Sequence, residues 1–294
     1  MKNIFKNKIS IPGFRYQGLS KRKFFKLLES SLRHKSFFDD NVDAFFKRLQ
    51  TKSFPNDKKI LITLKDISKH FPVPQDKPNV LFDKVNIQVK RGDVISLVGA
   101  NGVGKSTLLD ILVGYLNPNS GDVEYDLKYN WSPTEKIGIS YQKNVLLSSL
   151  SVWDYISFTH RLYKSSTTLD DLVIFCYAFG IEKFCKMRVS KLSGGQQQRL
   201  NAMLSLFHNP EIVLFDELCN NLDISIKKKI IDFIKHYFKI KNITAIIISH
   251  DVYEIKNMAN RIVVIKDKKI ANDLTVEALS HRAGGIDRLI ADSV

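Results

Sequence analysis

The feature that most constrains this chain is the stretch GANGVGKST at residues 99–107. It fits the pattern GxxxxGK[ST], in which Gly99, Gly104, Lys105 and Ser106 hold the fixed places. An apolar run of strand length precedes it at residues 93–98, and leucines and isoleucines at helical spacing follow it. A strand, a glycine loop and a helix in this order aim backbone N–H groups and the positive end of a helix at a polyphosphate. The stretch therefore predicts a nucleotide-binding α/β domain.

Each residue type in this loop has a physical role in holding phosphate. Glycines let the backbone approach closely, because a side chain would block that approach. Lys105 neutralises β- and γ-phosphate charge, and the Ser106 hydroxyl is a ligand for Mg²⁺. We expect the following residues of the loop to contact the nucleotide: Gly99, Asn101, Gly102, Gly104, Lys105, Ser106 and Thr107.

A second motif narrows the reaction to nucleotide hydrolysis. Residues 212–215 are four apolar residues suited to a buried parallel strand, and two acids, Asp216 and Glu217, follow them. At the carboxyl end of a strand beside the loop, Asp216 can hold the Mg²⁺ shell. Glu217 can polarise the attacking water as a general base. The pair predicts an ATPase rather than a simple nucleotide-binding module.

Between the two motifs lies LSGGQQQR at residues 192–199, where glycines and a hydroxyl open a predicted helix. With the loop and the acid pair in this order, the chain resembles the ATP-binding-cassette (ABC) family over roughly residues 60–275. The resemblance implies that ATP and Mg²⁺ are the cofactors. It also implies that a second cassette, an identical chain in preference to a related one, completes each ATP site with its own signature residues: Ser193, Gly194, Gly195 and Gln196.

Four further positions match the family one at a time. Gln142 resembles the glutamine that senses Mg²⁺ and the attacking water, and His250 resembles the switch histidine that contacts the γ-phosphate. Asp223 resembles the aspartate that couples the two sites of a dimer. Phe71 stands where the family has an aromatic that stacks on adenine, with His70 as an alternative.

One departure from the family pattern follows the acid pair. The family usually has proline after these acids, whereas this chain has Leu218 and then Cys219. The change affects the geometry of the turn and removes no catalytic group.

The net charge of +15 belongs mostly to the N-terminal segment. Residues 1–59 hold 15 Lys and Arg against 5 Asp and Glu, a net +10, so the remaining residues carry only +5. Helical spacing begins after Ser20 and again near Asn41, and three FF pairs make the segment unusually aromatic. Three interpretations stay open: two helices packed on the main domain or a partner, a basic element on an anionic membrane surface, or, least favoured, nucleic-acid binding.

The chain is therefore expected to be an α/β protein with a P-loop ABC-type nucleotide-binding domain. Residues 1–59 form a basic helical extension, residues 60–275 the ATPase domain, and residues 276–294 a short tail. The ATPase domain should contain an antiparallel β subdomain and, at about residues 143–195, an inserted helical subdomain. Helices are predicted at 152–163 and 169–179, with these core residues: Phe158, Leu162, Leu172 and Phe175.

No apolar run approaches the roughly 18 residues that a membrane span requires. The resemblance therefore implies a separate permease, with this chain peripheral on the cytoplasmic face of the membrane. The expected docking surface includes residues 143–150, Trp153 and Tyr155, although these apolar residues could equally be core. The stretch at 138–158 is similar to cassettes of export systems, so export is favoured over import. The rival interpretation is a soluble ABC ATPase that acts as an assembly or binding factor without a permease.

Overall fold

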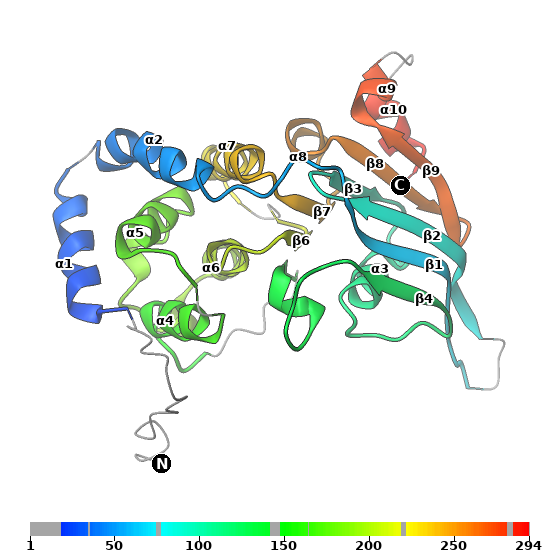
Figure 1. Cartoon of the computed structure of the whole chain (residues 1–294), viewed down its shortest axis with the longest axis horizontal. Helices are drawn as coiled ribbons and strands as arrows, with labels where there is room; N and C mark the ends of the chain where they lie inside the picture. Colours follow the sequence, from blue (N-terminus) through cyan, green and yellow to red (C-terminus); the bar gives the residue numbers. More distant parts are fainter. Residues whose placement is uncertain are drawn as a thin grey trace.

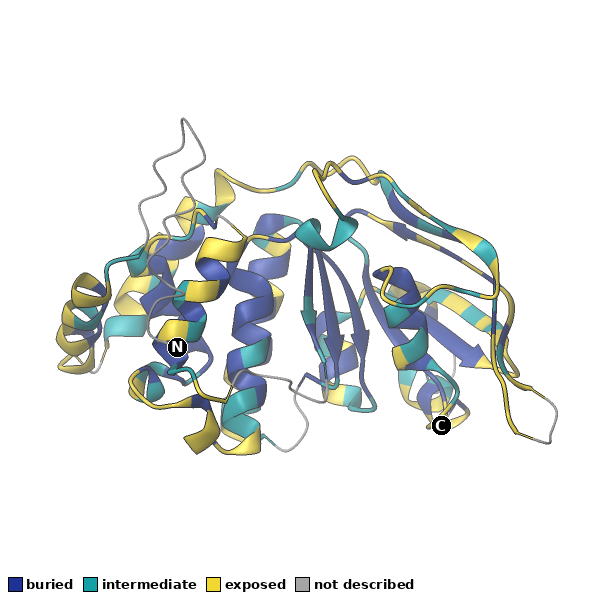
Figure 2. Ribbon diagram, turned by 90° about the horizontal axis from the view of Figure 1, so that it is seen from below, coloured by how far each residue is buried: buried dark blue, intermediate teal, exposed yellow. Residues whose placement is uncertain are grey.

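A six-stranded, mostly parallel sheet forms the centre of the computed structural model, which describes residues 19–34, 36–74, 78–141, 148–163, 165–218, 222–280 and 285–293. Its strands are β5 (Ile137–Ser140), β6 (Ile212–Asp216), β7 (Thr244–Ile248), β3 (Val94–Val98), β8 (Arg261–Lys266) and β9 (Lys269–Thr275), in that order. All neighbours are parallel except β8 and β9, which form an antiparallel hairpin. Every residue of β3, β6 and β7 is buried, as the continuous apolar runs predict (Figure 2).

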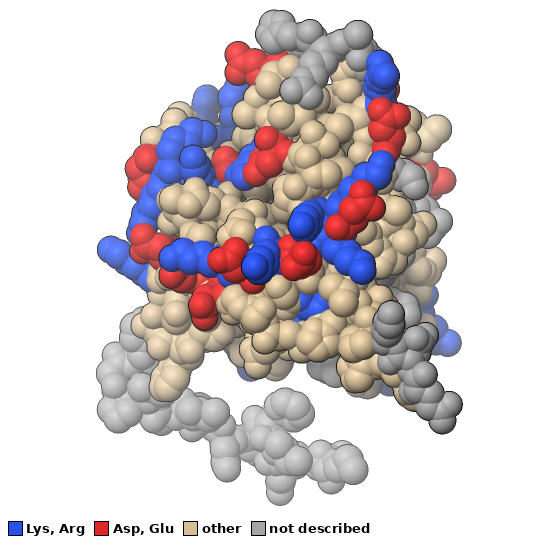
Figure 3. Space-filling view, turned by 90° about the vertical axis from the view of Figure 1, so that its right-hand side faces the viewer, with Lys and Arg blue, Asp and Glu red and all other residues tan. Residues whose placement is uncertain are grey.

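A smaller antiparallel sheet covers one face of this layer together with α3 (Lys105–Leu112) (Figure 1). Its strands are β2 (Asn79–Lys90), β1 (Ile60–Phe71) and β4 (Ser120–Tyr125), in that order. The third strand runs antiparallel to β1, with which residues 120–125 pair. Basic and acidic side chains are interleaved over this end of the molecule (Figure 3), with ion pairs such as Lys65–Glu124 at 2.6 Å.

The other face of the central sheet is covered by helices (Figure 1). They are α4 (Val152–Leu162), α5 (Leu169–Ala178), α6 (Gly194–Phe207) and α7 (Ile224–Lys241), with short 3₁₀ turns at Glu182–Phe184 and Val189–Lys191. Polar N-caps fix the first two: Ser151 accepts from Asp154 N, and Thr168 forms a capping box with Asp171. Another 3₁₀ turn, Pro133–Lys136, leads into β5.

The predicted core of this helical region is half wrong. Leu172 and Phe175 are buried, but Phe158 and Leu162 are 48% and 61% exposed. The apolar positions of α4 extend around more than one face, and the buried face is the one that carries Val152, Trp153 and Ile156. Spacing alone identifies an apolar face without showing which neighbour covers it.

The N-terminal extension packs on the helical region through two helices, α1 (Lys21–Leu32) and α2 (Phe37–Gln50). The second helix begins four residues earlier than the predicted start near Asn41. Phe24 of α1 is fully buried and stacks on Trp153, with ring centroids 4.3 Å apart. Phe45 of α2 is also fully buried, 5.5 Å from the Phe175 ring.

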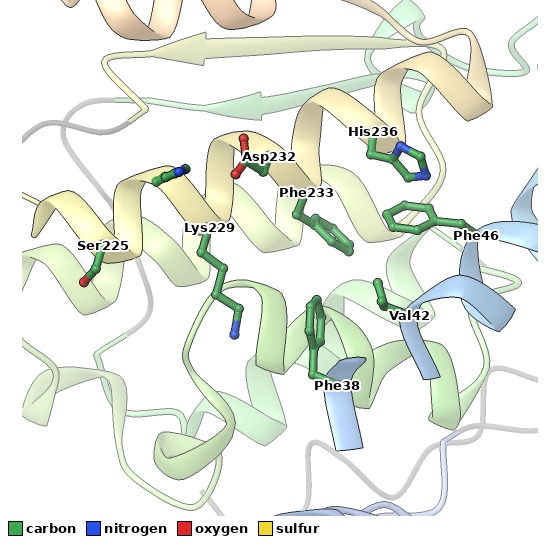
Figure 4. Close-up of a pocket in the computed structure, with 9 residues that line it drawn as sticks. Phe38, Val42, Phe46, Ser225, Lys229, Asp232, Phe233 and His236 are labelled. Atoms are coloured by element: carbon green, nitrogen blue, oxygen red, sulfur yellow. The ribbon is translucent and has the colours of Figure 1, made fainter. Parts of the chain in front are cut away.

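These contacts confirm the first of the three interpretations of the extension, helices packed on the main domain. Their apolar side chains are used inside the protein, so a membrane-surface role, which stays a prediction, would have to use other residues. The segment 53–59 has no regular secondary structure, and the N–H of Phe54 donates to the Lys241 carbonyl at 2.9 Å. A surface hollow of about 540 Å³ lies where α2 meets α7, with Phe46 beside His236 (Figure 4).

The C-terminal residues form three short helices: α8 (Val252–Met258), α9 (Val276–Ser280) and α10 (Gly285–Ala291). They pack against β8 around a small apolar cluster that includes Ile255, Ile262 and Ile290. Throughout the described ranges, no helix is both long enough and apolar enough to cross a membrane.

Candidate functional site

Three loops meet at one edge of the central sheet. The glycine loop follows β3, Asp216 ends β6 with Glu217 directly after it, and His250 follows β7. These strands are neighbours in the order β6–β7–β3 and run parallel, so their carboxyl ends lie together. Ligands of open α/β sheets bind at this kind of edge. The fold therefore gathers groups from three distant parts of the sequence.

The glycine loop has the backbone that its sequence predicts. Gly104 has φ 104°, and a Cβ there would lie 2.7 Å from the Phe82 ring, so the position needs glycine for both conformation and space. Gly104 is the N-cap of α3, which places the start of that helix at the loop. The Lys105 ammonium folds back over the loop and donates to the carbonyls of Gly99 at 2.7 Å and Ala100 at 3.1 Å. Burial lowers the pKa of Lys105, and Glu217 and Asp216 oppose that effect.

Ser106 and Asp216 form the pair expected to hold a metal ion. The Ser106 hydroxyl donates to Asp216 Oδ2 at 2.9 Å. Asp216 is only 7% exposed, and burial raises its pKa despite that hydrogen bond. Across the part of the chain that is described, no cluster of three His, Cys, Asp or Glu side chains could hold a metal by itself. One hydroxyl and one carboxylate suit Mg²⁺ bound together with phosphate oxygens rather than in an all-protein cage.

His250 and Glu217 face the same space as Lys105. Neither ring nitrogen of His250 is exposed to solvent or has a hydrogen-bond partner among the described residues. Burial lowers the pKa of His250, and the Lys105 charge lowers it further, whereas Glu217 raises it. Unpaired buried nitrogens are costly, so the site suits an anionic oxygen that would pair with this ring.

The signature residues form a separate helix start that is open to solvent. Ser193 is the N-cap of α6, and its side chain and that of Gln196 form a reciprocal capping box. Ser193 and Gly194 are exposed, and a Cβ added at Gly194 would meet nothing within 4 Å. Gly195 is half-buried in the first turn. The glycine at 194 is therefore not required by packing within this chain.

The remaining predicted residues are less constrained by the structure. Phe71 ends β1, is 39% exposed, and has the Lys69 ammonium 5.1 Å from its ring centroid. The backbone N–H of His70 donates to Asn119 at 2.9 Å. Asp223 is the exposed N-cap residue of α7. Gln142 and the proposed docking residues 143–147 lie outside the described residues, so their roles stay predictions.

Sequence reasoning missed two groups that hold the site in place. Gln198 on α6 donates its side-chain amide to the backbone carbonyl of Glu217. Behind His250, the Ser249 hydroxyl donates to the buried Glu254 carboxylate at 2.8 Å and accepts from the N–H of Asp251 at 3.0 Å. Gln198 belongs to the recognised LSGGQQQR run, but nothing in the sequence indicates which side chain it meets.

Comparison with known proteins agrees with this geometry. A family model described as "ABC transporter" matches residues 82–220. A Staphylococcus epidermidis protein named for hemin import, the ATP-binding protein HrtA, is 36% identical over 224 residues, which cover 72% of this chain and 99% of that protein. The tyrosine transport ATP-binding protein of Clostridioides difficile is 26% identical, with 76% and 98% covered. A dimeric cassette, MJ0796, in a post-hydrolysis state with ADP and Pi, superposes with a TM-score of 0.65 at 26% identity, covering 73% of this chain and 98% of that one.

Proposed function

Because this chain belongs to the ABC family and is an ATP-binding ATPase subunit of the kind found in transporters, we propose that it works as a dimer that drives a separate membrane permease. Each ATP is held between the glycine loop of one chain and the signature helix of the other. The observation that carries this proposal is the exposure of Ser193 and Gly194. A helix start with its N-terminal N–H groups open to solvent can receive a phosphate that a second chain presents.

The site residues divide the chemistry among them. The N–H groups of residues 102–106 and the Lys105 ammonium bind the phosphates, and Ser106 with Asp216 would hold Mg²⁺, to which Gln142 would add a ligand. When bound, Mg²⁺ neutralises charge on the β- and γ-phosphate oxygens. Glu217 orients and deprotonates the attacking water. His250 donates to γ-phosphate oxygens, which gives its unpaired ring a partner.

Hydrolysis then works as a switch. ATP favours the closed dimer because it touches both chains, and loss of the γ-phosphate removes the contacts that differ between the closed and open states. The dimeric form of MJ0796 supports this arrangement. Two identical chains suffice, since one chain carries both halves of the site.

Mixing two inactive variants tests the shared site. Lys105→Ala removes the phosphate ligand of a chain's own loop, and Ser193→Ala removes what it offers to its partner. In an equal mixture, half of the dimers contain one intact site, so binding of a non-hydrolysable ATP analogue between two chains should recover to about a quarter of the wild-type amount. Self-contained sites predict no recovery above either variant alone, and that result would refute the proposal.

Of the residues expected to meet the permease, Trp153 is not available on the surface, because it is 3% exposed beneath Phe24. We place the contact instead on the outer face of α4, where Tyr155, Phe158 and Leu162 form a stripe at helical spacing. Exposed apolar stripes of this kind mark interaction surfaces. A permease helix bound to this stripe would hold the chain at the cytoplasmic face of the membrane.

A charge on this stripe should separate docking from hydrolysis. Phe158→Glu with Leu162→Glu should abolish co-purification with the permease and leave hydrolysis by the isolated protein unchanged. Trp131→Glu, which alters a 91% exposed side chain in the loop between β4 and the Pro133–Lys136 turn, is the matched control. Retained co-purification of the double variant would exclude this surface.

The direction of transport is a separate question. The similarity of residues 138–158 to export cassettes favours export. Relatives named for import of hemin, taurine and spermidine/putrescine favour import instead. We give the relatives more weight, because their similarity extends over at least 69% of the chain. ATP-dependent uptake into inverted vesicles, as opposed to release from them, would identify an exporter.

A further inference from the structure

The backbone of Glu217 is held in an unusual conformation from two sides. Its φ is 59°, in the left-handed region, directly after the buried strand β6. A residue with a Cβ adopts this conformation only where surrounding contacts compensate for the strain. The Glu217 N–H donates to the Ile248 carbonyl at 3.0 Å, and the Glu217 carbonyl accepts from the side-chain amide of Gln198.

Gln198 connects this backbone to the signature helix. It is 9% exposed and lies on α6, which runs without interruption from Gly194 to Phe207 and packs beside β6 (Figure 1). It follows Ser193 by five positions, an axial distance of about 7 Å along a helix. The same helix therefore begins at Ser193, which is exposed, and carries Gln198 about one and a half turns later. Gln198 is hydrogen-bonded to the backbone of the catalytic acid.

We propose that Gln198 is a positioning residue that orients Glu217 according to where the signature helix stands. The inference rests on the proposed function, in which Ser193 contacts the nucleotide of the partner chain. When α6 shifts to meet that nucleotide, Gln198 shifts with it and moves the Glu217 carbonyl. The carboxylate of each chain then reaches its working position when that chain has engaged its partner, so hydrolysis in one site depends on closure of the other.

A purely structural role would look different. The hydrogen bond also satisfies a buried carbonyl, so its loss must cost some stability whatever else it does. The effect of losing Gln198 on stability can still be distinguished from its effect on catalysis. A positioning role predicts that the rate depends on Gln198 only while Glu217 can act as a base. A double-mutant cycle between the two residues measures that dependence.

The experiment compares Gln198→Leu in the wild-type protein and in Glu217→Gln. Leucine keeps most of the volume and removes the donor. In the wild type, kcat should fall about 10- to 100-fold with an unchanged KM for ATP, since misplacing a reacting group by about 1 Å costs up to about 100-fold. In the Glu217→Gln background, the same substitution should change the residual rate by less than about twofold.

Ser205→Ala is the matched control, because its buried hydroxyl donates to Ala202 within the same helix at 2.8 Å and it should leave kcat unchanged. If Gln198→Leu does not fold, Gln198→Met keeps the length of the unbranched side chain and has no donor. If Gln198→Leu reduced kcat by the same factor in both backgrounds, or left kcat normal in the wild type, the inference would be overturned. Glu217 would remain the base in either case. Unchanged hydrolysis in Glu217→Gln alone would refute the assigned base, which is a distinguishable failure of the proposed function.

Discussion

Glu254 should give the stability of this protein a pH dependence that one substitution removes. Its side chain is 2% exposed behind the His250 loop, where it accepts from the Ser249 hydroxyl at 2.8 Å. Burial raises the pKa of Glu254 from 4.5 to about 7, against the effect of that hydrogen bond. The folded protein therefore binds this proton more tightly than the unfolded chain does.

The sign and size of the effect follow from this difference. A raised pKa stabilises the folded state relative to the unfolded state only while the group is protonated, so the contribution is complete below pH 4.5 and lost as the pH rises through 7. At about 1.4 kcal/mol per pKa unit, the full loss is about 3 kcal/mol. Most of this loss of stability should occur between pH 5 and 8.5, where it amounts to about 2 to 3 kcal/mol.

Urea unfolding of the wild type and Glu254→Gln at several pH values measures this contribution. Glutamine stays neutral and can still accept from Ser249, so the variant should become more stable than the wild type as the pH rises. Burial lowers the pKa of His208 to about 4. This group and the other titrating groups are present in both proteins, so their contributions cancel in the comparison. Glu124→Gln is the control: it alters an exposed carboxylate that pairs with Lys65, and it should show no such trend. A constant difference between wild type and Glu254→Gln from pH 5 to 8.5 would refute the reasoning.

Four further outcomes are expected. Glu217→Gln should nearly abolish turnover and trap an ATP-dependent dimer on size-exclusion chromatography, because binding is kept while the base is lost. Lys105→Ala should weaken ATP binding itself, and a titration showing normal affinity would count against the phosphate loop. Gly194→Ala should leave thermal stability unchanged within about 1 kcal/mol, because its Cβ meets nothing within 4 Å, yet lower hydrolysis at least tenfold by obstructing the partner's phosphate. Phe45→Ala, at a fully buried ring, should lower the free energy of unfolding by about 3 to 5 kcal/mol in denaturant titrations.

The sequence by itself determined the parts whose geometry is local. A glycine loop between a strand and a helix, an apolar strand that ends in two acids, and a serine that opens a helix each form within a few residues. Their order predicted the parallel sheet, and parallel strands bring their carboxyl ends together, so Lys105, Asp216 and His250 met as expected.

Only the tertiary structure decided which surfaces are covered and which distant groups touch. Periodicity placed Trp153, Phe158 and Leu162 on one helix, but the packing of α1 buried the first and left the other two exposed. The bond from Gln198 to the Glu217 carbonyl likewise depends on how α6 lies beside β6. Burial and side-chain contacts depend on segments far apart in the chain, and a local sequence pattern does not specify which segment will pack against it.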